Sequence, residues 1–231
     1  IPAIGDESDG AFQADLAYYM SLKPLRDSLF SGDLLGSSYV DILNPIDAFQ
    51  TLLGVTIDPD LTPSLYQLFM SIEECCGQLC QSVQQRSLMR RRPFDVFGQE
   101  PFTLEDSAQL RRQNSYPSLQ ASVGLGTALL LSMILPNQCD TLIKIGYQYG
   151  MNRVISGTSW QSDIDAGRCV SCLALSVVAS GSDFLDLLED AIAEYRDLHD
   201  IIITDIPTIN PDAHVNETPL YTIDGRRASP H

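Results

Sequence analysis

Apolar side chains recur at every third or fourth position along one long stretch of this sequence, and this spacing limits the fold more than any other feature. The stretch contains Leu65, Phe69, Ile72, Cys76 and Leu79. Residues spaced in this way lie on one face of an α-helix, which must be buried against other elements. Thr-Pro-Ser at 62–64 is typical of a helix start and Pro93 of a helix end, so we predict a helix from 62 to about 91.

Other segments also have helical composition, and each is bounded by Pro, Gly or Ser. They are 11–31, where Pro24 must lie at a start or a kink, a short helix at 47–53, and 118–135, 139–151, 160–180 and 183–199. The alternating pattern of a strand is scarce, with residues 201–204 as a short candidate. The expected fold class is therefore all-α.

The length of 231 residues, with 44% of them hydrophobic and 19% charged, is enough for one substantial core. We expect one helical domain over residues 1–200 and an irregular tail, rich in Pro, Asp and Asn, over residues 201–231. Such a tail becomes ordered only by packing on its own core or on a neighbouring subunit. Because packing on a neighbouring subunit would order the tail, we expect a homo-oligomer or a subunit of a larger complex.

The chain is strongly acidic, with 30 Asp and Glu residues against 14 Lys and Arg residues and a net charge of −16. This charge repels the phosphate backbone of nucleic acids, so no nucleic-acid partner is expected. The longest apolar run, 123–135, is shorter than the roughly 20 residues that a membrane span needs, and Pro136 closes it. We therefore expect a buried core helix there and no membrane span.

Six cysteines suit an oxidising compartment. They are Cys75, Cys76, Cys80, Cys139, Cys169 and Cys172. At least one disulfide from the first three to the last three is predicted, with free buried thiols and metal binding as the alternatives, although the spacing does not suit zinc.

The chain opens at Ile1 rather than at a methionine, which fits export and removal of a signal segment. A secreted or periplasmic location is therefore expected. Asn216 opens a glycosylation sequon, but Pro219 follows the motif directly.

Three motifs then carry a resemblance to a known family. They are Met-Arg-Arg-Arg-Pro-Phe at 89–94, Asn-Ser-Tyr-Pro-Ser at 114–118, and Gly-Tyr-Gln-Tyr-Gly at 146–150, which continues through Asn152 and Arg153 to Trp160 and Arg168. In order and spacing they resemble the bacterial class A non-specific acid phosphatases, within the superfamily of type 2 phosphatidic acid phosphatases and vanadium haloperoxidases. Weaker similarity covers 12–16 and extends to about residue 195. The resemblance implies an all-helical domain in which the segments near Arg92, Ser118 and Ser159 converge on one pocket, and a tendency to self-associate.

The resemblance also implies a set of catalytic roles. In the family, two arginines and a lysine neutralise the phosphate, and a serine with backbone amides holds its oxygens. One histidine attacks phosphorus, an aspartate four residues later orients that histidine, and a second histidine protonates the leaving alcohol.

Part of this set is present in the sequence and part is replaced. The retained positions, expected to bind an oxyanion or another ligand, are Arg92, Ser118, Arg153 and Asp163. The replaced positions are Gln85 for the lysine, Leu119 for the glycine before the acid histidine, Gln120 for the acid histidine, Ser159 for the nucleophile and Asn152 for the serine before the second arginine. The three histidines, His199, His214 and His231, all lie beyond the motifs.

These replacements predict a member of the family that does not hydrolyse phosphate esters, and neither a metal nor another cofactor is expected. Glutamine cannot donate a proton at a useful pH, and a serine hydroxyl needs a base to attack phosphorus. The retained charged residues allow two interpretations. Asp163, without its histidine, pairs with an arginine as a structural bridge, or Arg92 and Arg153 still hold an oxyanion.

Three functions remain open at this point. The first is a pocket made more neutral by Gln85, Leu119, Gln120 and Ser159, which binds a small neutral or apolar molecule. The second is a structural or assembly subunit with an idle pocket. The third is a weak residual acid phosphatase.

Overall fold

The computed structural model of the chain describes residues 10–30, 45–103 and 105–199. These residues form a single helical domain, and no strand occurs among them, so the all-α prediction is confirmed. The strand candidate at 201–204, the irregular tail and Asn216 lie outside the described residues.

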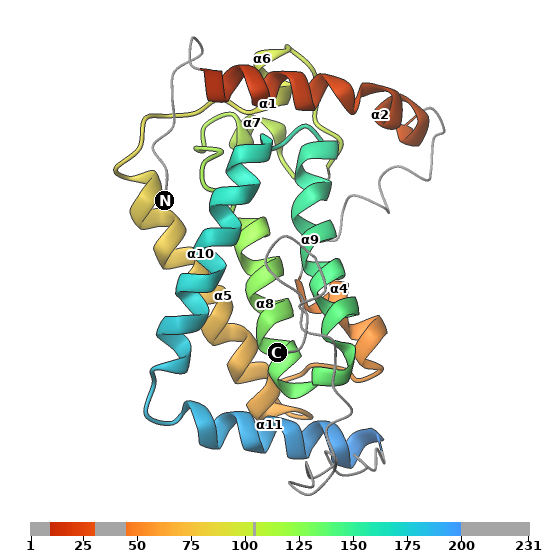
Figure 1. The fold of residues 1–231 in the computed structure, drawn as a ribbon, viewed down its shortest axis with the longest axis vertical. Coiled ribbons are helices and arrows are strands. Elements are labelled where there is room, and N and C mark those ends of the chain that lie inside the picture. The colour runs from red at the N-terminus through yellow and green to blue at the C-terminus, as the bar shows by residue number, and fades with distance from the viewer. Residues whose placement is uncertain (1–9, 31–44, 104, 200–231) are drawn as a thin grey trace, which may run out of the picture. The chain divides into compact units, whose positions relative to one another are not determined.

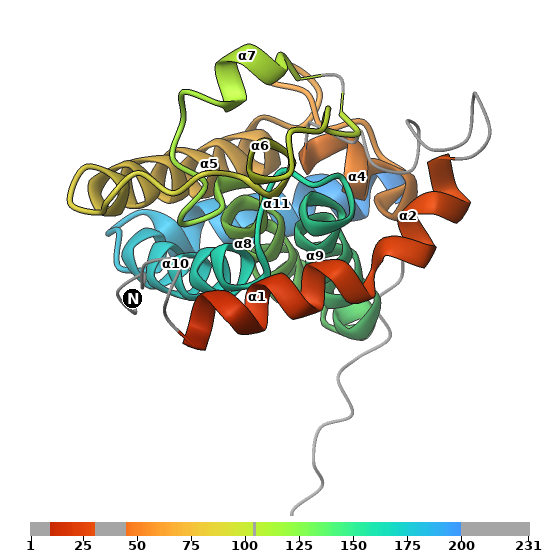
Figure 2. The ribbon, with the colours of Figure 1, turned by 90° about the horizontal axis from the view of Figure 1, so that it is seen from above.

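Four long helices form the body of the domain (Figure 1). They are α5 (Pro63–Gln84), α8 (Leu119–Ile134), α9 (Cys139–Ile155) and α10 (Gln161–Ala179). Helix α8 packs against the other three, and the end-on view of Figure 2 shows α8 between α10 and α9, with α5 along a further side of it. Every residue of α8 from Ala121 to Ala128 is buried, which explains the long apolar run in the sequence.

Two further helices run across the two ends of this bundle (Figure 1). Helix α1 (Gly10–Ser21) crosses the end at which α8 and α10 begin, and α11 (Phe184–His199) crosses the opposite end. The remaining elements are α2 (Lys23–Phe30), α4 (Pro45–Leu53), α6 (Pro93–Val96), α7 (Ser107–Leu110) and the short 3-10 helix η1 (Pro136–Gln138). Pro24 lies in the first turn of α2, just after the predicted break.

Two helix ends differ from the prediction. Helix α5 stops at Gln84 rather than near residue 91, and α9 continues to Ile155 rather than 151. The extended segment after α5 carries Arg90 and Arg92 to buried partners on other elements. Those long-range contacts favour an extended backbone over the further helical turns that local composition alone would allow.

Glycines allow the helices of the bundle to approach closely. A Cβ atom at Gly167 of α10 would lie 2.4 Å from the carbonyl oxygen of Ser118, and one at Gly146 of α9 would lie 2.8 Å from that of Gly124. Any side chain at either position would therefore clash with these carbonyl oxygens. The start of α8 is therefore held directly against α10.

The predicted disulfide is wrong, because all six cysteines lie among the described residues and are free thiols. Cys76 and Cys80 point into the core, whereas Cys169 and Cys172 are exposed on α10. A disulfide requires two side chains that face one another at short range, and these face different surroundings. Burial raises the pKa of Cys76 to about 11 and that of Cys80 to about 12, so both remain protonated thiols at neutral pH.

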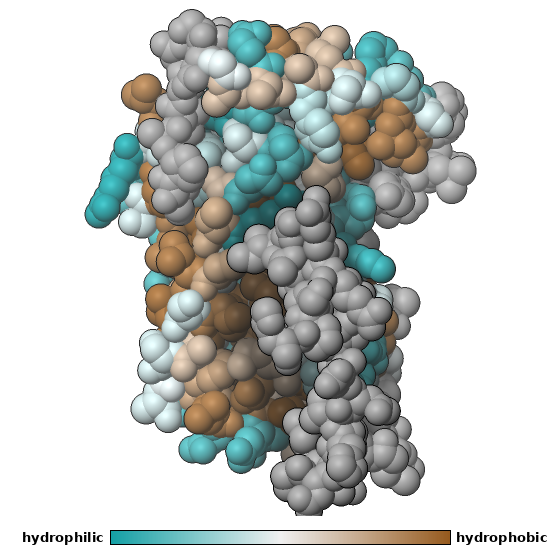
Figure 3. Space-filling view, in the orientation of Figure 1, coloured by the Kyte–Doolittle hydropathy of each residue, from teal (hydrophilic) through white to brown (hydrophobic). Residues whose placement is uncertain are grey.

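Within the described part of the chain, no single helix is long and apolar enough to cross a membrane. Helices α10 and α11 meet the requirements of length and composition only together, and they are bent by 101° relative to one another. Figure 3 shows apolar side chains gathered along α10 on one face of the domain. Leu173 and Val177 belong to this strip and are 51% and 55% exposed.

Candidate functional site

A cavity of about 300 Å³ lies at the end of the bundle where α8 and α10 begin and α9 ends. Six residues that the motifs singled out line it: Arg92, Ser118, Leu119, Gln120, Arg153 and Ser159. The predicted convergence of the three motif segments on one pocket is therefore confirmed. Leu119 does not fill the space, since its side chain is 39% exposed and the cavity stays open beside it.

Two residues that the motifs singled out are not part of the cavity wall. Gln85 is exposed, and its neighbour Gln84 lines the cavity in its place. Asp163 is fully buried beside the start of α10, outside the set of lining residues.

Arg92 is a buried cation whose described contacts are all with backbone carbonyls. Its guanidinium donates to the oxygens of Leu110 at 3.1 Å, Thr158 at 2.6 Å and Asn114 at 3.4 Å. Burial, together with the nearby charge of Arg153, lowers the pKa of Arg92 to about 10, so it is still protonated at neutral pH. These contacts fix the orientation of the guanidinium without neutralising its charge.

Arg153, in the last turn of α9, is the second cation of the cavity. Its side chain is 6% exposed, and its Nη2 donates to the carboxylate of Glu105, which also lines the cavity and is 25% exposed. Glu105 follows α6 in a segment without helical periodicity, so no sequence pattern drew attention to it. The cavity therefore contains two guanidiniums and one carboxylate.

The first turn of α8 also faces the cavity. Ser118 is the N-cap, and its Oγ accepts a hydrogen bond from the amide of Ala121 at 3.3 Å. The amides of Leu119 and Gln120 belong to the first turn, whose N–H groups have no partner within the helix. A helix N-terminus of this kind attracts anions.

Ser159 is brought to the cavity by a tight turn after α9. Gly157 has a φ of +79°, a left-handed conformation that favours glycine and ends the helix. The amides of Thr158 and Ser159 then both donate to the carbonyl of Arg153, at 2.9 and 3.0 Å. The turn thus holds the backbone of Ser159 against the residue that supplies one of the cations.

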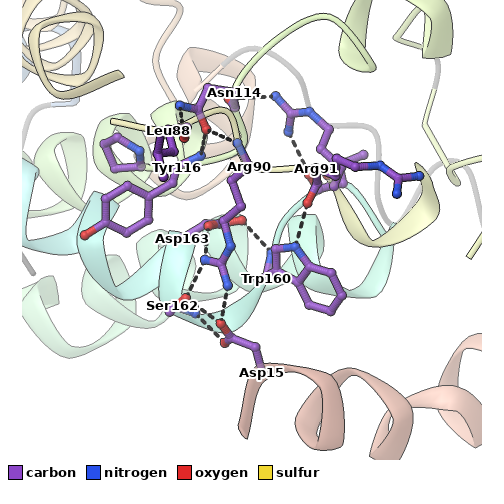
Figure 4. A network of polar contacts seen from close by, with 12 residues as sticks. Asp15, Leu88, Arg90, Arg91, Asn114, Tyr116, Trp160, Ser162 and Asp163 are labelled. Atoms are coloured by element: carbon purple, nitrogen blue, oxygen red, sulfur yellow. Dashed lines mark hydrogen bonds and ion pairs between the residues drawn. The ribbon is translucent and has the colours of Figure 1, made fainter. Parts of the chain in front are cut away.

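Asp163 is the centre of a buried ion-pair network shown in Figure 4. Arg90 donates from Nη1 to Asp163 and from Nη2 to Asp15 of α1, each at 2.6 Å. The other oxygen of Asp163 accepts from the amide of Trp160 at 2.7 Å, and the amide of Ser162 donates to Asp15 at 2.9 Å. Of the two interpretations of Asp163, its role as a structural bridge agrees with this geometry.

Asp163 is therefore not available as a base for Ser159. Burial raises its pKa, while Arg90 and the amide of Trp160 act in the opposite direction and favour the carboxylate. Both of its oxygens already accept hydrogen bonds from these two groups. The carboxylate caps α10 and joins this helix to α1 through Arg90. It therefore takes no part in the chemistry of the pocket.

The motif comparison missed Arg90, which precedes the retained arginine by two positions, and it assigned no role to Asp15. The run of three arginines at 90–92 indicates that a buried cation lies in this segment, but the sequence does not show which of the three side chains points inward. The structure separates them: Arg90 and Arg92 are buried, and Arg91 is exposed. Among the described residues, no group of three or more His, Cys, Asp or Glu side chains is arranged to hold a metal ion.

A helical bundle with a basic pocket at one end is the class of protein that these observations define. No family model matches the chain. It is 34% identical over 152 residues to the non-specific acid phosphatase of Providencia stuartii, covering 66% of this chain and 61% of that protein's length. It is 28% identical over 211 residues to the non-specific acid phosphatase of Salmonella typhimurium, covering 91% of this chain and 84% of the relative.

The resemblance to the non-specific acid phosphatases that the motifs predicted is confirmed by these relatives. The prediction that it is not an enzyme is wrong on this comparison, because the relatives that match most of its length are named as phosphatases. The prediction rested on the replacement of the acid histidine by Gln120 and of the nucleophile by Ser159. The structure has an open cavity that contains both arginines.

Proposed function

We propose that this protein binds the phosphoryl group of a phosphate monoester in the cavity and hydrolyses it slowly. The observation that carries the proposal is the pair Arg92 and Arg153 in one cavity, with Glu105 as the carboxylate of its wall. Two guanidiniums beside a helix N-terminus match the charge and the hydrogen-bond acceptors of a phosphoryl group.

The proposed reaction follows from the remaining polar groups. The Ser159 oxygen forms a bond to phosphorus as the ester P–O bond breaks, and the serine proton ends on the departing alcohol. Water then cleaves the phosphoserine to phosphate and serine. Both steps are slow, because Asp163 is not available as a base for Ser159 and Gln120 is not an acid. General acid catalysis alone is typically worth about 10²- to 10⁴-fold. Charge stabilisation by the arginines remains, and such groups keep a residual acceleration when the acid and base of an enzyme are absent.

The polar character of the cavity argues against the neutral or apolar ligand that the sequence suggested. Its wall contains two cations and several amide and hydroxyl side chains, among them Gln84, Gln113 and Gln120. Burying apolar ligand surface against these groups would strip them of water without replacing their hydrogen bonds. Secretion or export to a periplasm, and assembly into a homo-oligomer, remain predictions.

The binding step is tested by calorimetric titration of the protein with inorganic phosphate at pH 7.5. Arg92→Gln and Arg153→Gln should each weaken binding by about 10-fold or more, since a hydrogen bond to a charged group is worth about 1.5–3 kcal/mol. Arg91→Gln is the matched control, because Arg91 lies in the same arginine run but is exposed. Equal affinities in all four proteins would refute the proposed site.

The hydrolytic step is tested with an aryl phosphate between pH 4 and 8. Slow turnover should be lost in Ser159→Ala. The double variant Ser159→His/Gln120→His should be faster than wild type by about 10²-fold or more, with little gain in either single variant, because such groups act as a unit. Turnover that persists unchanged in Ser159→Ala would contradict the assignment of the nucleophile.

A further inference from the structure

Glu105 is the carboxylate on the cavity wall, and it is bound to one of the two cations that the proposed function assigns to the phosphoryl group. Its carboxylate contacts Nη2 of Arg153, and the hydroxyl of Thr103 lies 3.4 Å from the same carboxylate oxygen. The amide of Glu105 donates to that hydroxyl at 3.2 Å, which holds the residue in the turn before α7. Glu105 is therefore anchored next to the site at which a phosphoryl group would bind.

Binding of a phosphoryl group changes the surroundings of this carboxylate. A phosphate monoester carries close to two negative charges at pH 7.5. When its oxygens take the N–H groups of Arg153, Glu105 loses its cationic partner and faces a new negative charge. A partly buried carboxylate without a partner is costly, and like charges at close range add to that cost.

A cation on the ligand itself would remove this cost. The cavity then presents two guanidiniums to the phosphoryl group and one carboxylate to an ammonium group, and its net charge of about +1 matches a ligand of net charge −1. The volume of about 300 Å³ corresponds to roughly ten water molecules at about 30 Å³ each, which leaves room beyond the phosphoryl group for a short aminoalkyl chain.

We propose that Glu105 is a specificity-determining residue that selects phosphate monoesters bearing a positively charged amine close to the phosphoryl group. This inference rests on the proposed function, because it needs the phosphoryl group to bind at Arg92 and Arg153. It extends that function by naming the class of substrate. Glu105 binds the ammonium group in the complex, as it binds Arg153 in its absence.

The test compares two ligands of nearly equal size, 2-aminoethyl phosphate and propyl phosphate, by calorimetric titration at pH 7.5. They differ in that an ammonium group replaces a methyl group. Wild type should bind 2-aminoethyl phosphate about 10-fold more tightly, which corresponds to about 1.4 kcal/mol for one charge-assisted contact. Glu105→Gln should bind propyl phosphate more tightly than wild type does and should lose most of the preference for the amine.

Glu100→Gln is the matched control, because Glu100 lies in the same segment and pairs with Arg111 on the surface, where it is 73% exposed. It should keep the wild-type preference. Equal binding of the two ligands by wild type, or a preference that survives in Glu105→Gln, would overturn the inference while leaving phosphate binding intact. Absence of binding for both ligands and for inorganic phosphate would instead refute the proposed function.

Discussion

At the scale of single residues, Arg90 shows how a buried charge joins distant parts of this chain. Its side chain is 8% exposed and lies between Asp15, which is 5% exposed, and Asp163, which is fully buried. Three charged groups removed from water are tolerated here because each accepts or donates several hydrogen bonds. The network connects α1, the segment after α5 and the start of α10.

Arg90→Met should therefore destabilise the domain strongly. The variant leaves two buried carboxylates without a counter-charge, and breaking a buried ion pair in this way costs about 3–5 kcal/mol. Arg91→Met is the matched control, because Arg91 is 54% exposed and pairs with Asp95 at the surface, where an ion pair is worth about 1 kcal/mol or less. Urea denaturation at pH 7 measures both, and similar midpoints for the two variants would contradict the role given to Arg90.

The buried thiols predict a loss of stability at alkaline pH. Burial raises the pKa of Cys76 and of Cys80 above the ordinary value of 9.0. Above pH 9 the unfolded chain releases these protons while the folded domain keeps them, so the free energy of unfolding falls as pH rises from 9 towards 11. Their contribution is fully present below pH 9.

The expected fall between pH 8 and pH 10 is about 1 kcal/mol for each thiol, since one pKa unit corresponds to about 1.4 kcal/mol. Denaturation with urea under reducing conditions at the two pH values measures it. The variant Cys76→Ala/Cys80→Ala is less stable at both, but its unfolding free energy should fall with pH by clearly less than that of wild type. The remaining fall comes from other groups whose pKa is raised by burial, such as Cys75 and Tyr149. A fall as steep as that of wild type would show that other groups cause the alkaline effect.

At the scale of elements, the contact between α8 and α10 positions the candidate site. Gly167 of α10 lies against the carbonyl oxygen of Ser118, and the amide of Ser118 donates to the carbonyl of Asp163 at 2.9 Å. This close approach brings the start of α8 next to the Ser159 turn. The site thus depends on a backbone distance that only glycine permits at position 167.

Gly167→Ala should lower the free energy of unfolding by about 1–3 kcal/mol, the usual cost of forcing extra atoms into a packed core. It should also weaken phosphate binding, because the start of α8 must move. Gly77→Ala is the matched control: Gly77 lies within α5, where an added Cβ meets no atom within 4 Å. That variant should be neutral or stabilised by up to about 1 kcal/mol, since alanine is the better helix former. Equal effects of the two substitutions on stability would show that the α8–α10 contact is not tight.

At the scale of the whole molecule, the exposed apolar strip along α10 is a candidate surface for association with another chain. Leu173 and Val177 are about half exposed, and the free thiols Cys169 and Cys172 lie on the same helix. Apolar side chains grouped on one helix are typical of a contact surface. We propose that a second copy of this chain covers the strip.

Light scattering on the purified protein should then give a mass of at least twice 25.4 kDa. Leu173→Glu should return it to the monomer, because a carboxylate is costly in an apolar interface. Leu185→Glu is the control on a different helix, α11, where the residue is 68% exposed, and it should leave the mass unchanged. A monomer in wild type would contradict the proposal.

Local patterns were sufficient for the fold class and for most helix positions. The three- to four-residue spacing from Leu65 to Leu79, the breaks at proline and glycine, and the apolar run of α8 are properties of neighbouring residues, so they can be read along the chain. The family resemblance carried by the motifs predicted that the segments near Arg92, Ser118 and Ser159 converge, and the structure places these residues around one cavity.

The partners within that site depend on contacts between residues far apart in the chain. Arg90 lies 73 positions from Asp163 and 75 from Asp15, and Glu105 lies 48 positions from Arg153. From the sequence alone, each carboxylate could pair with any of several arginines, and no periodic pattern marks the segment that contains Glu105. The free thiols have the same explanation, because whether two cysteines face one another depends on how the helices are rotated in the packed bundle. The spacing of charged and sulfur-containing residues therefore limits the available pairings, and the packing of α1, α8, α9 and α10 selects among them.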